Sequence, residues 1–158
     1  MTGSLRPIEG SHTLRCELAS EVLRSSGTLR LQVNGWSMLP SVLPGDTLTV
    51  KSVTSEEICE GDIVLFGRDC RLFVHRVAKK SGHGSIITRG DAMPHADPPV
   101  SEGELLGRVS FVVRNGKLIE PSRHPRLAGR AVAAMARRSK IAARVIVGLH
   151  GLRQTLAG

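Results

Sequence analysis

Residues 35–40 read Gly-Trp-Ser-Met-Leu-Pro and residues 43–46 read Leu-Pro-Gly-Asp, the densest cluster of unusual residues in the chain. Pro44 and Gly45 suit the two central positions of a type II turn, in which the second residue takes a positive φ. Pro40 disfavours a helical conformation for the residue before it. Ser37 is therefore expected on irregular chain just before a strand, where an isolated serine is most often an ordinary loop residue.

The chain around this cluster alternates between apolar and polar residues, which is typical of half-buried strands. Strands are expected from Thr28 onward and at residues 47–53, 62–66, 71–78, 85–89 and 105–114. The dipeptide Asn115-Gly116 predicts a hairpin with a two-residue turn. A short helix is expected from Thr13 to Ser26, with Leu14, Leu18 and Val22 on one face. The fold class is mainly β, with a short N-terminal helix and a basic C-terminal helix.

The net charge of +8 on these 158 residues belongs to the C-terminal end. Residues 1–122 contain 14 basic and 14 acidic side chains, whereas residues 123–158 contain eight basic ones and no acidic one. We therefore expect a body at 1–122 and a basic helical tail at 123–158. In a helical tail, one stripe would carry Arg126, Arg130, Arg137 and Arg144, opposite Val132, Met135, Ala142, Ile146 and Leu149.

Two interpretations of this tail stay open: its apolar face packs on the body, or it contacts an anionic membrane surface. Nucleic acid is not an expected partner, since aromatic residues, which stack on bases, make up only 3% of the chain. No apolar run reaches the roughly 20 residues of a transmembrane helix, and no signal-peptide pattern is present. We expect a cytoplasmic protein, with any membrane contact peripheral and at the inner face.

Cofactor and metal sites are not predicted. The cysteines, Cys16, Cys59 and Cys70, are widely spaced without a C-x-x-C pair, which argues against a disulfide framework and against zinc. We expect them to be small hydrophobic residues of the core.

The Ser37 cluster belongs to an ordered series of motifs. Gly-x-Ser-Met-x-Pro, four residues and Gly-Asp resemble the nucleophile box of type I signal peptidases, which LexA-like self-cleaving repressors share. Residues 61–64 (Gly-Asp-Ile-Val), 74–77 (Val-His-Arg-Val), 88–91 (Thr-Arg-Gly-Asp) and 106–109 (Leu-Gly-Arg-Val) fit the same pattern in order. The resemblance covers about residues 28–113. It implies a signal peptidase/LexA-like β fold and a serine endopeptidase that cleaves an extended peptide or protein segment.

A serine hydroxyl needs a neighbouring base to take its proton during attack. His75 is the natural candidate, because an unperturbed imidazole has a pKa of about 6.5 and is mostly neutral at pH 7. His75 shares one face of its expected strand with Phe73 and Val77. The alternative is a hydrogen-bonded structural histidine.

The resemblance also implies roles for other residues. Bacterial signal peptidases usually carry Lys at the position of His75, whereas the archaeal and endoplasmic-reticulum branch carries His. In that branch an Asp after the third Gly-Asp orients the imidazole, and Asp97 matches it, with Asp91 as the rival. Gly35 stands where some bacterial relatives have a serine that donates to the oxyanion, so backbone N–H groups near Ser37 are expected to serve instead. Arg76 resembles the family's basic pair and is expected to be structural.

Two other functions compete with this hypothesis. A LexA-like self-cleaving or DNA-binding regulator would have a cleavable Ala-Gly bond ahead of the nucleophile, but the Ala-Gly pairs here follow Ser37. A non-catalytic binding module would not need the complete set of Ser, His and Asp. Signal peptidases also ordinarily carry a transmembrane anchor, which this sequence lacks, so the secretory substrate is a weaker expectation than the site.

Overall fold

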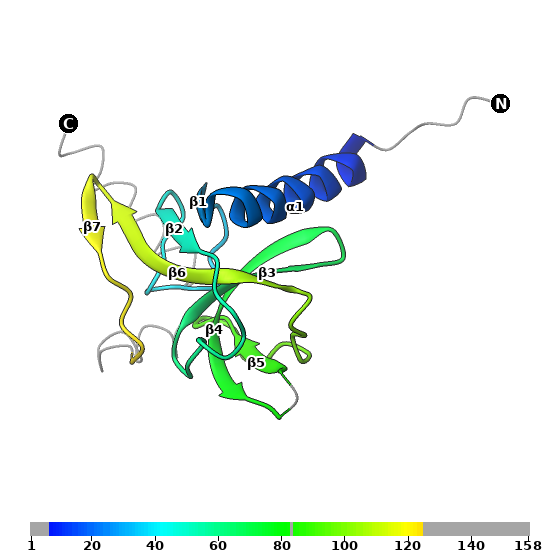
Figure 1. Cartoon of the computed structure of the whole chain (residues 1–158). Helices are drawn as coiled ribbons and strands as arrows, with labels where there is room; N and C mark the ends of the chain where they lie inside the picture. The colour runs from blue at the N-terminus through cyan, green and yellow to red at the C-terminus, as the bar shows by residue number, and fades with distance from the viewer. Residues whose placement is uncertain (1–6, 83, 125–158) are drawn as a thin grey trace.

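The computed structural model describes residues 7–82 and 84–124, including the side chains of residues 13–82 and 84–124. The tail helix predicted after residue 122 lies outside the described residues from position 125 onward. The described chain forms a helix and an antiparallel sheet (Figure 1). Its elements are α1 (Pro7–Ser26), β1 (Thr28–Gln32), β2 (Thr47–Lys51), β3 (Ile63–Arg68), β4 (Arg71–Lys80), β5 (Ile86–Arg89), β6 (Leu105–Arg114) and β7 (Lys117–Ile119).

The strand order is β1-β2-β6-β3-β4-β5, with β7 paired to β6 as a hairpin. β6 lies between β2 and β3, since its residues 108–113 pair with β2 and its residues 105–108 pair with β3. This long strand therefore joins a first half, β1 and β2, to a second half, β3 to β5. The predicted mainly β class with an N-terminal helix is confirmed.

Two hydrophobic clusters fill the interior, and β3 contributes to both. Successive side chains of a strand point to opposite faces. Ile63 and Leu65 accordingly pack in one cluster with Leu23 of α1, while Val64 and Phe66 pack in the other. The side chains of Ile63, Val64, Leu65 and Phe66 are all buried, so β3 is an interior strand of the fold.

The turns follow the predicted backbone chemistry. Gly45 has a φ of 92°, and the N–H of Asp46 donates to the carbonyl of Leu43, as in a type II turn after Pro44. Asn115 and Gly116 have φ values of 51° and 74°, which suit a two-residue hairpin turn. Both turn predictions are confirmed.

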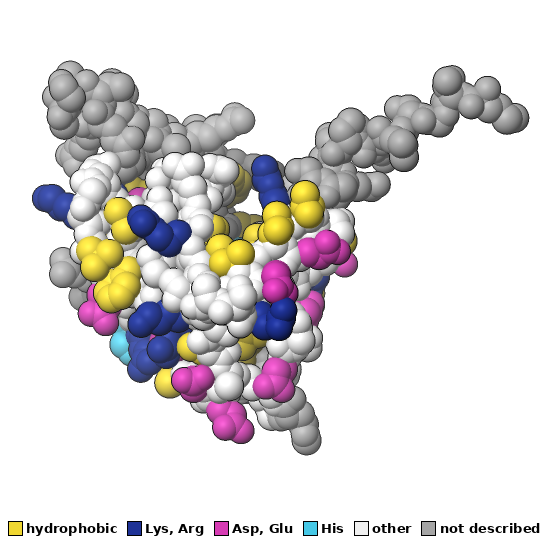
Figure 2. Space-filling model, turned by 45° about the horizontal axis from the view of Figure 1, so that its top comes forward, with side chains coloured by type: hydrophobic (Ala, Val, Ile, Leu, Met, Phe, Trp, Pro, Cys, Tyr) yellow, Lys and Arg dark blue, Asp and Glu magenta, His cyan; other side chains and the backbone are white. Residues whose placement is uncertain are grey.

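The predicted helix boundary and its apolar face need correction. α1 begins at Pro7 instead of Thr13, which is possible because proline lacks only an N–H that the first turn does not use. Leu14, Leu18 and Val22 are exposed, and among the side chains of α1 that the structure describes, Ala19 and Leu23 are buried. Figure 2 shows the hydrophobic side chains on the α1 side of the surface. The apolar stripe expected from the sequence is therefore mostly exposed to solvent.

The prediction that the cysteines lie in the core is wrong for Cys59 and Cys70, which are exposed, and Cys16 is only partly buried. Cys70 is the second residue of the tight β3–β4 turn, where Asp69 and Cys70 have φ values of 48° and 58°. A turn position on the surface overrides the general preference of cysteine for the interior. The strand predictions are correct in place, with ends that differ by a few residues.

Candidate active site

Ser37 lies on irregular chain between β1 and β2, as predicted. The two residues after it, Met38 and Leu39, are buried and anchor the loop. The N–H of Ala92 donates to the carbonyl of Ser37 over 2.8 Å. The backbone that carries the hydroxyl is thus held from the core and from the chain after β5.

His75 lies on β4 with its imidazole directed at Ser37. Its Nε2 is 3.1 Å from Ser37 Oγ, within hydrogen-bond distance. The His75 side chain is only 8% exposed, and the rings of Phe66 and Phe73 lie about it at centroid distances of 6.0 and 6.1 Å. These rings confine the imidazole and keep its orientation toward the serine.

Asp97 holds the other side of the imidazole. His75 Nδ1 is 2.6 Å from Asp97 Oδ2, and Thr88 Oγ1 donates to the same oxygen over 2.7 Å. The N–H of Asp97 donates to the Thr88 carbonyl, which fixes the loop after β5. Burial raises the pKa of Asp97. The hydrogen bonds from His75 and Thr88 and the positive charge nearby lower it by more than burial raises it, so the pKa lies below its ordinary value. Asp97 is therefore a carboxylate at neutral pH.

A charged carboxylate can only accept, so Nδ1 carries the proton that bonds to Asp97. In a neutral imidazole Nε2 then has its lone pair free to accept the Ser37 hydroxyl proton. The three side chains form one continuous chain of hydrogen bonds, which suits base-assisted attack by a serine.

Asp91, the rival for the orienting role, is paired with Arg76 instead. Arg76 Nε and Nη2 donate to the two carboxylate oxygens of Asp91 over 2.8 and 2.9 Å, and both side chains are largely buried. The Ser41 hydroxyl also donates to Asp91. Arg76 Nη1 donates to the carbonyls of Gly61 and Ser122. This network ties the Ser37 loop to β4 and to the chain after β7.

Three contributors escaped the sequence-based site list: Thr88, Ser41 and Gly90. Thr88 is fully buried and bonds to Asp97. A Cβ on Gly90 would lie 2.6 Å from the Ser37 carbonyl oxygen and 3.1 Å from His75 Nε2. Thr88 and Gly90 do belong to the motif at residues 88–91, so the sequence indicated this segment. Only the fold shows what each residue contacts.

A groove of about 690 Å³ opens beside Ser37 and His75. Its walls come from β1, from residues 33–38, from β4 residues 71–75 and from α1. Gly35 lies on its lining next to Ser37, without a side chain to narrow it. Most of the lining is apolar, including Leu31, Val33 and Phe73.

Two strand edges along this groove have no strand partner among the described residues. β1 pairs only with β2. β4 pairs with β3 along residues 71–76, but with β5 only from Arg76 onward. The edges of Thr28–Gln32 and of residues 71–75 thus carry backbone groups that can pair with an added chain.

Ser37, His75 and Asp97 form a hydrogen-bonded Ser-His-Asp arrangement on a mainly β scaffold, and the side chains described include no cluster of metal ligands. A scan against protein-family models matches residues 3–110 to the family described as Peptidase S24-like. The chain belongs to this family. The comparison with curated proteins gave no match. Across residues 7–82 and 84–124, no helix has the length and apolar character to cross a membrane.

Proposed function

We propose that the protein is a serine endopeptidase of signal-peptidase type, of the branch that uses histidine as base. The observation that carries the proposal is the unbroken series of hydrogen bonds from Ser37 through His75 to Asp97. Ser37 is the nucleophile, His75 the general base and Asp97 the residue that orients the imidazole. Family membership supports the peptidase class.

The reaction follows from which atoms can hold the proton. Ser37 Oγ attacks the scissile carbonyl carbon while its proton moves to His75 Nε2, and the imidazolium is stabilised by the Asp97 carboxylate. The C–N bond then breaks as the imidazolium protonates the leaving amine, which leaves an ester on Ser37. Water attacks this ester with His75 again as base, so that the acid product leaves and the hydroxyl is restored.

The substrate is an extended peptide or protein segment. The unpaired edges of β1 and β4 both border the groove, so an extended chain can add as a strand and present its carbonyl to Ser37. Apolar residues such as Leu31 and Phe73 on the lining favour apolar side chains near the scissile bond.

The test is cleavage by purified full-length protein, with Ser37→Ala and His75→Ala as variants. Each substitution is expected to lower kcat/KM by roughly 10³-fold or more, as deletion of a nucleophile or base does in other serine peptidases. Ser110→Ala is a matched control, since the Ser110 hydroxyl bonds to the Thr49 carbonyl away from the groove. Equal cleavage by parent and Ser37→Ala would refute the proposal.

Self-cleavage is a second candidate, supported by the Peptidase S24-like match, since LexA-like proteins share the nucleophile box. The described chain before Ser37 is folded into α1 and β1, which favours a separate substrate. A dilution series separates the two. First-order appearance of a shortened chain, independent of protein concentration and lost in Ser37→Ala, would establish self-cleavage.

A peripheral membrane contact through the basic tail is a further proposal, carried by the sequence alone. Each arginine near an anionic leaflet contributes about 1 kcal/mol. Full-length protein should therefore sediment with vesicles that contain phosphatidylserine and not with neutral ones. Changing Arg126, Arg130, Arg137 and Arg144 to Gln should abolish this binding, and equal sedimentation would refute it.

A further inference from the structure

The groove has a second end, distant from Ser37. Residues 70–75 all lie on its lining, with His75 at one end of this run and Arg71 near the other. A strand rises about 3.3 Å per residue, so Arg71 lies about 13 Å from His75 along β4. Residues 71, 73 and 75 also share one side of the strand. Arg71 is exposed at this far end.

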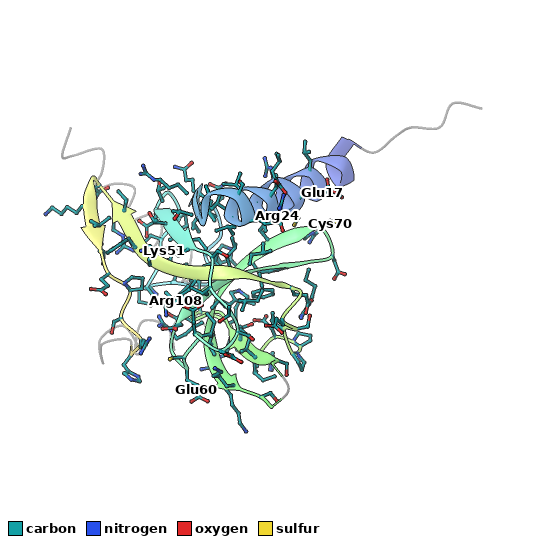
Figure 3. The ribbon with its side chains drawn as sticks, viewed as in Figure 1. Glu17, Arg24, Lys51, Glu60, Cys70 and Arg108 are labelled. Atoms are coloured by element: carbon teal, nitrogen blue, oxygen red, sulfur yellow. The ribbon has the colours of Figure 1, made fainter. Side chains whose placement is uncertain are left out.

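A second arginine lies at the same end. Arg15 of α1 lies on the groove lining with Leu18, one turn further along the helix. Cys16 and Cys70, the chain neighbours of Arg15 and Arg71, line one adjacent hollow together, which brings this part of α1 against the β3–β4 turn. Figure 3 shows Cys70 at that turn, close beneath α1 and Glu17.

These two guanidinium groups lack a carboxylate partner among the residues the structure describes. Several other arginines of the body are paired, as Arg68 is with Glu104 and Arg114 with Asp46. The described lining of the groove includes no Asp or Glu, whereas the adjacent hollow is bordered by Glu17, Glu21, Asp69 and Glu104. The far end of an apolar groove therefore carries two arginines whose guanidinium groups form no ion pair with a described carboxylate.

We propose that the groove selects segments with an Asp or Glu about four residues from the scissile bond, held by Arg71 and Arg15. This inference rests on the proposed function, since it assumes that Ser37 cuts the segment. An extended peptide paired with the open edge of β4 advances at the same rise as β4 itself. Its fourth residue from the cut therefore lies beside Arg71, and the residues between lie along the apolar lining.

The size of the preference follows from the exposure of both arginines. Ion pairs in contact with water contribute modestly, which corresponds to about a two- to fivefold preference for each arginine at low salt. The screening length falls from roughly 30 Å at 0.01 M salt to 8 Å at 0.15 M, so the preference should shrink as salt is added.

The experiment uses a synthetic peptide library of mixed sequence, with cleavage sites read by mass spectrometry. Parent protein, Arg71→Gln and Arg15→Gln are compared, with Arg30→Gln as control, because Arg30 is exposed on β1 but does not line the groove. Peptide pairs that differ only by Glu or Gln at the enriched position then give the ratio of kcat/KM. Binding of the same pairs to Ser37→Ala measures the preference without cleavage.

Acid enrichment at a fixed position in the parent, retained in Arg30→Gln and reduced in Arg71→Gln and Arg15→Gln, would support the proposal. Cleavage that depends on Ser37 but ignores the acidic residue would overturn this inference and leave the proposed function intact. Absence of any cleavage that depends on Ser37 would overturn both.

Discussion

Arg76 and Asp91 face each other through two parallel hydrogen bonds of 2.8 and 2.9 Å, one residue along the chain from His75 and one from Gly90. The pair is buried, with side chains 11% and 8% exposed. The Asp91 carboxylate also accepts a hydrogen bond from the Ser41 hydroxyl. Arg76, the motif residue next to His75, thus supports the site, while Asp97 contacts the His75 imidazole itself.

Removing one partner of this buried pair should destabilise the protein. Arg76→Met leaves Asp91 without its bidentate donor in a buried site, which costs about 3–5 kcal/mol in comparable cases. Urea unfolding at pH 7 measures the free energy. Arg24→Met is the control, since Arg24 pairs with Glu21 on the surface, and should unfold as the parent does. An Arg76→Met variant as stable as the control would show that the network does not contribute to the free energy of unfolding.

Asp97→Asn and Asp91→Asn should separate orientation of the base from support of the fold. An amide at position 97 can hold the imidazole in the wrong tautomer, so kcat should fall by roughly 10³- to 10⁴-fold with little change in Tm. Asp91→Asn should lower Tm, because it weakens the Arg76 pair. Kinetics and thermal melts on both variants test this. The reverse pattern would make Asp91 the orienting carboxylate.

Gly90 should not tolerate a methyl group. The added Cβ would meet the Ser37 carbonyl oxygen at 2.6 Å and Met93 Cγ at 2.7 Å, so the loop that carries Ser37 must shift. Displacements near 1 Å at a catalytic group reduce rates by up to about 100-fold. Gly90→Ala should therefore lower kcat by about tenfold or more. Gly103→Ala, where the methyl meets open space, should match the parent.

Thr88 should hold down the pKa of Asp97. Burial pushes the pKa of this carboxyl up, and the Thr88 hydroxyl is one of the bonds that bring it below its ordinary value. Thr88→Val removes that bond and should raise the pKa of Asp97, while Thr88→Ser should preserve it. Carboxyl ¹³C chemical shifts followed against pH measure the change directly. An unchanged titration in Thr88→Val would assign the depression to His75 instead.

The Arg68–Glu104 pair should stabilise the fold by an amount that is lost in acid. Hydrogen bonds from Arg68 and Ser101 lower the pKa of Glu104 to about 2 against burial, which raises it. A pKa lower in the folded state stabilises the fold above the unfolded value of 4.5, and this contribution is lost as the pH falls toward 2. Glu104→Gln should unfold more easily at pH 7 and lose less stability between pH 5 and 2. Arg68→Met should flatten the curve similarly.

The parts of this structure that sequence could predict are those with local causes. Gly45 and Asn115 need positive φ angles, and alternation marks strands whose side chains face a core on one side. The prediction that Ser37 and His75, which are 38 positions apart, are partners depends on ordered motifs that resemble a family. Neither residue alone would have indicated more than a loop serine and a core histidine.

The remaining features depend on contacts between distant segments. Which face of α1 is buried depends on where β1 and β4 pass beneath it, so Leu18 is exposed although the helical pattern groups it with apolar neighbours. The role of Thr88 depends on the loop that returns Asp97 to β5. The exposure of Cys70 depends on the tight turn that it occupies.

The central place of β6 has a consequence for a chain emerging from the ribosome. The hydroxyl belongs to the β1–β2 half, whereas the imidazole and its carboxylate belong to the half built on β3 to β5, and only β6 pairs with both. Until residues 105–114 have been synthesised and have left the exit tunnel, the two halves have no common strand. Ser37 can therefore be held opposite His75 and Asp97 by a shared strand only after β6 has been made.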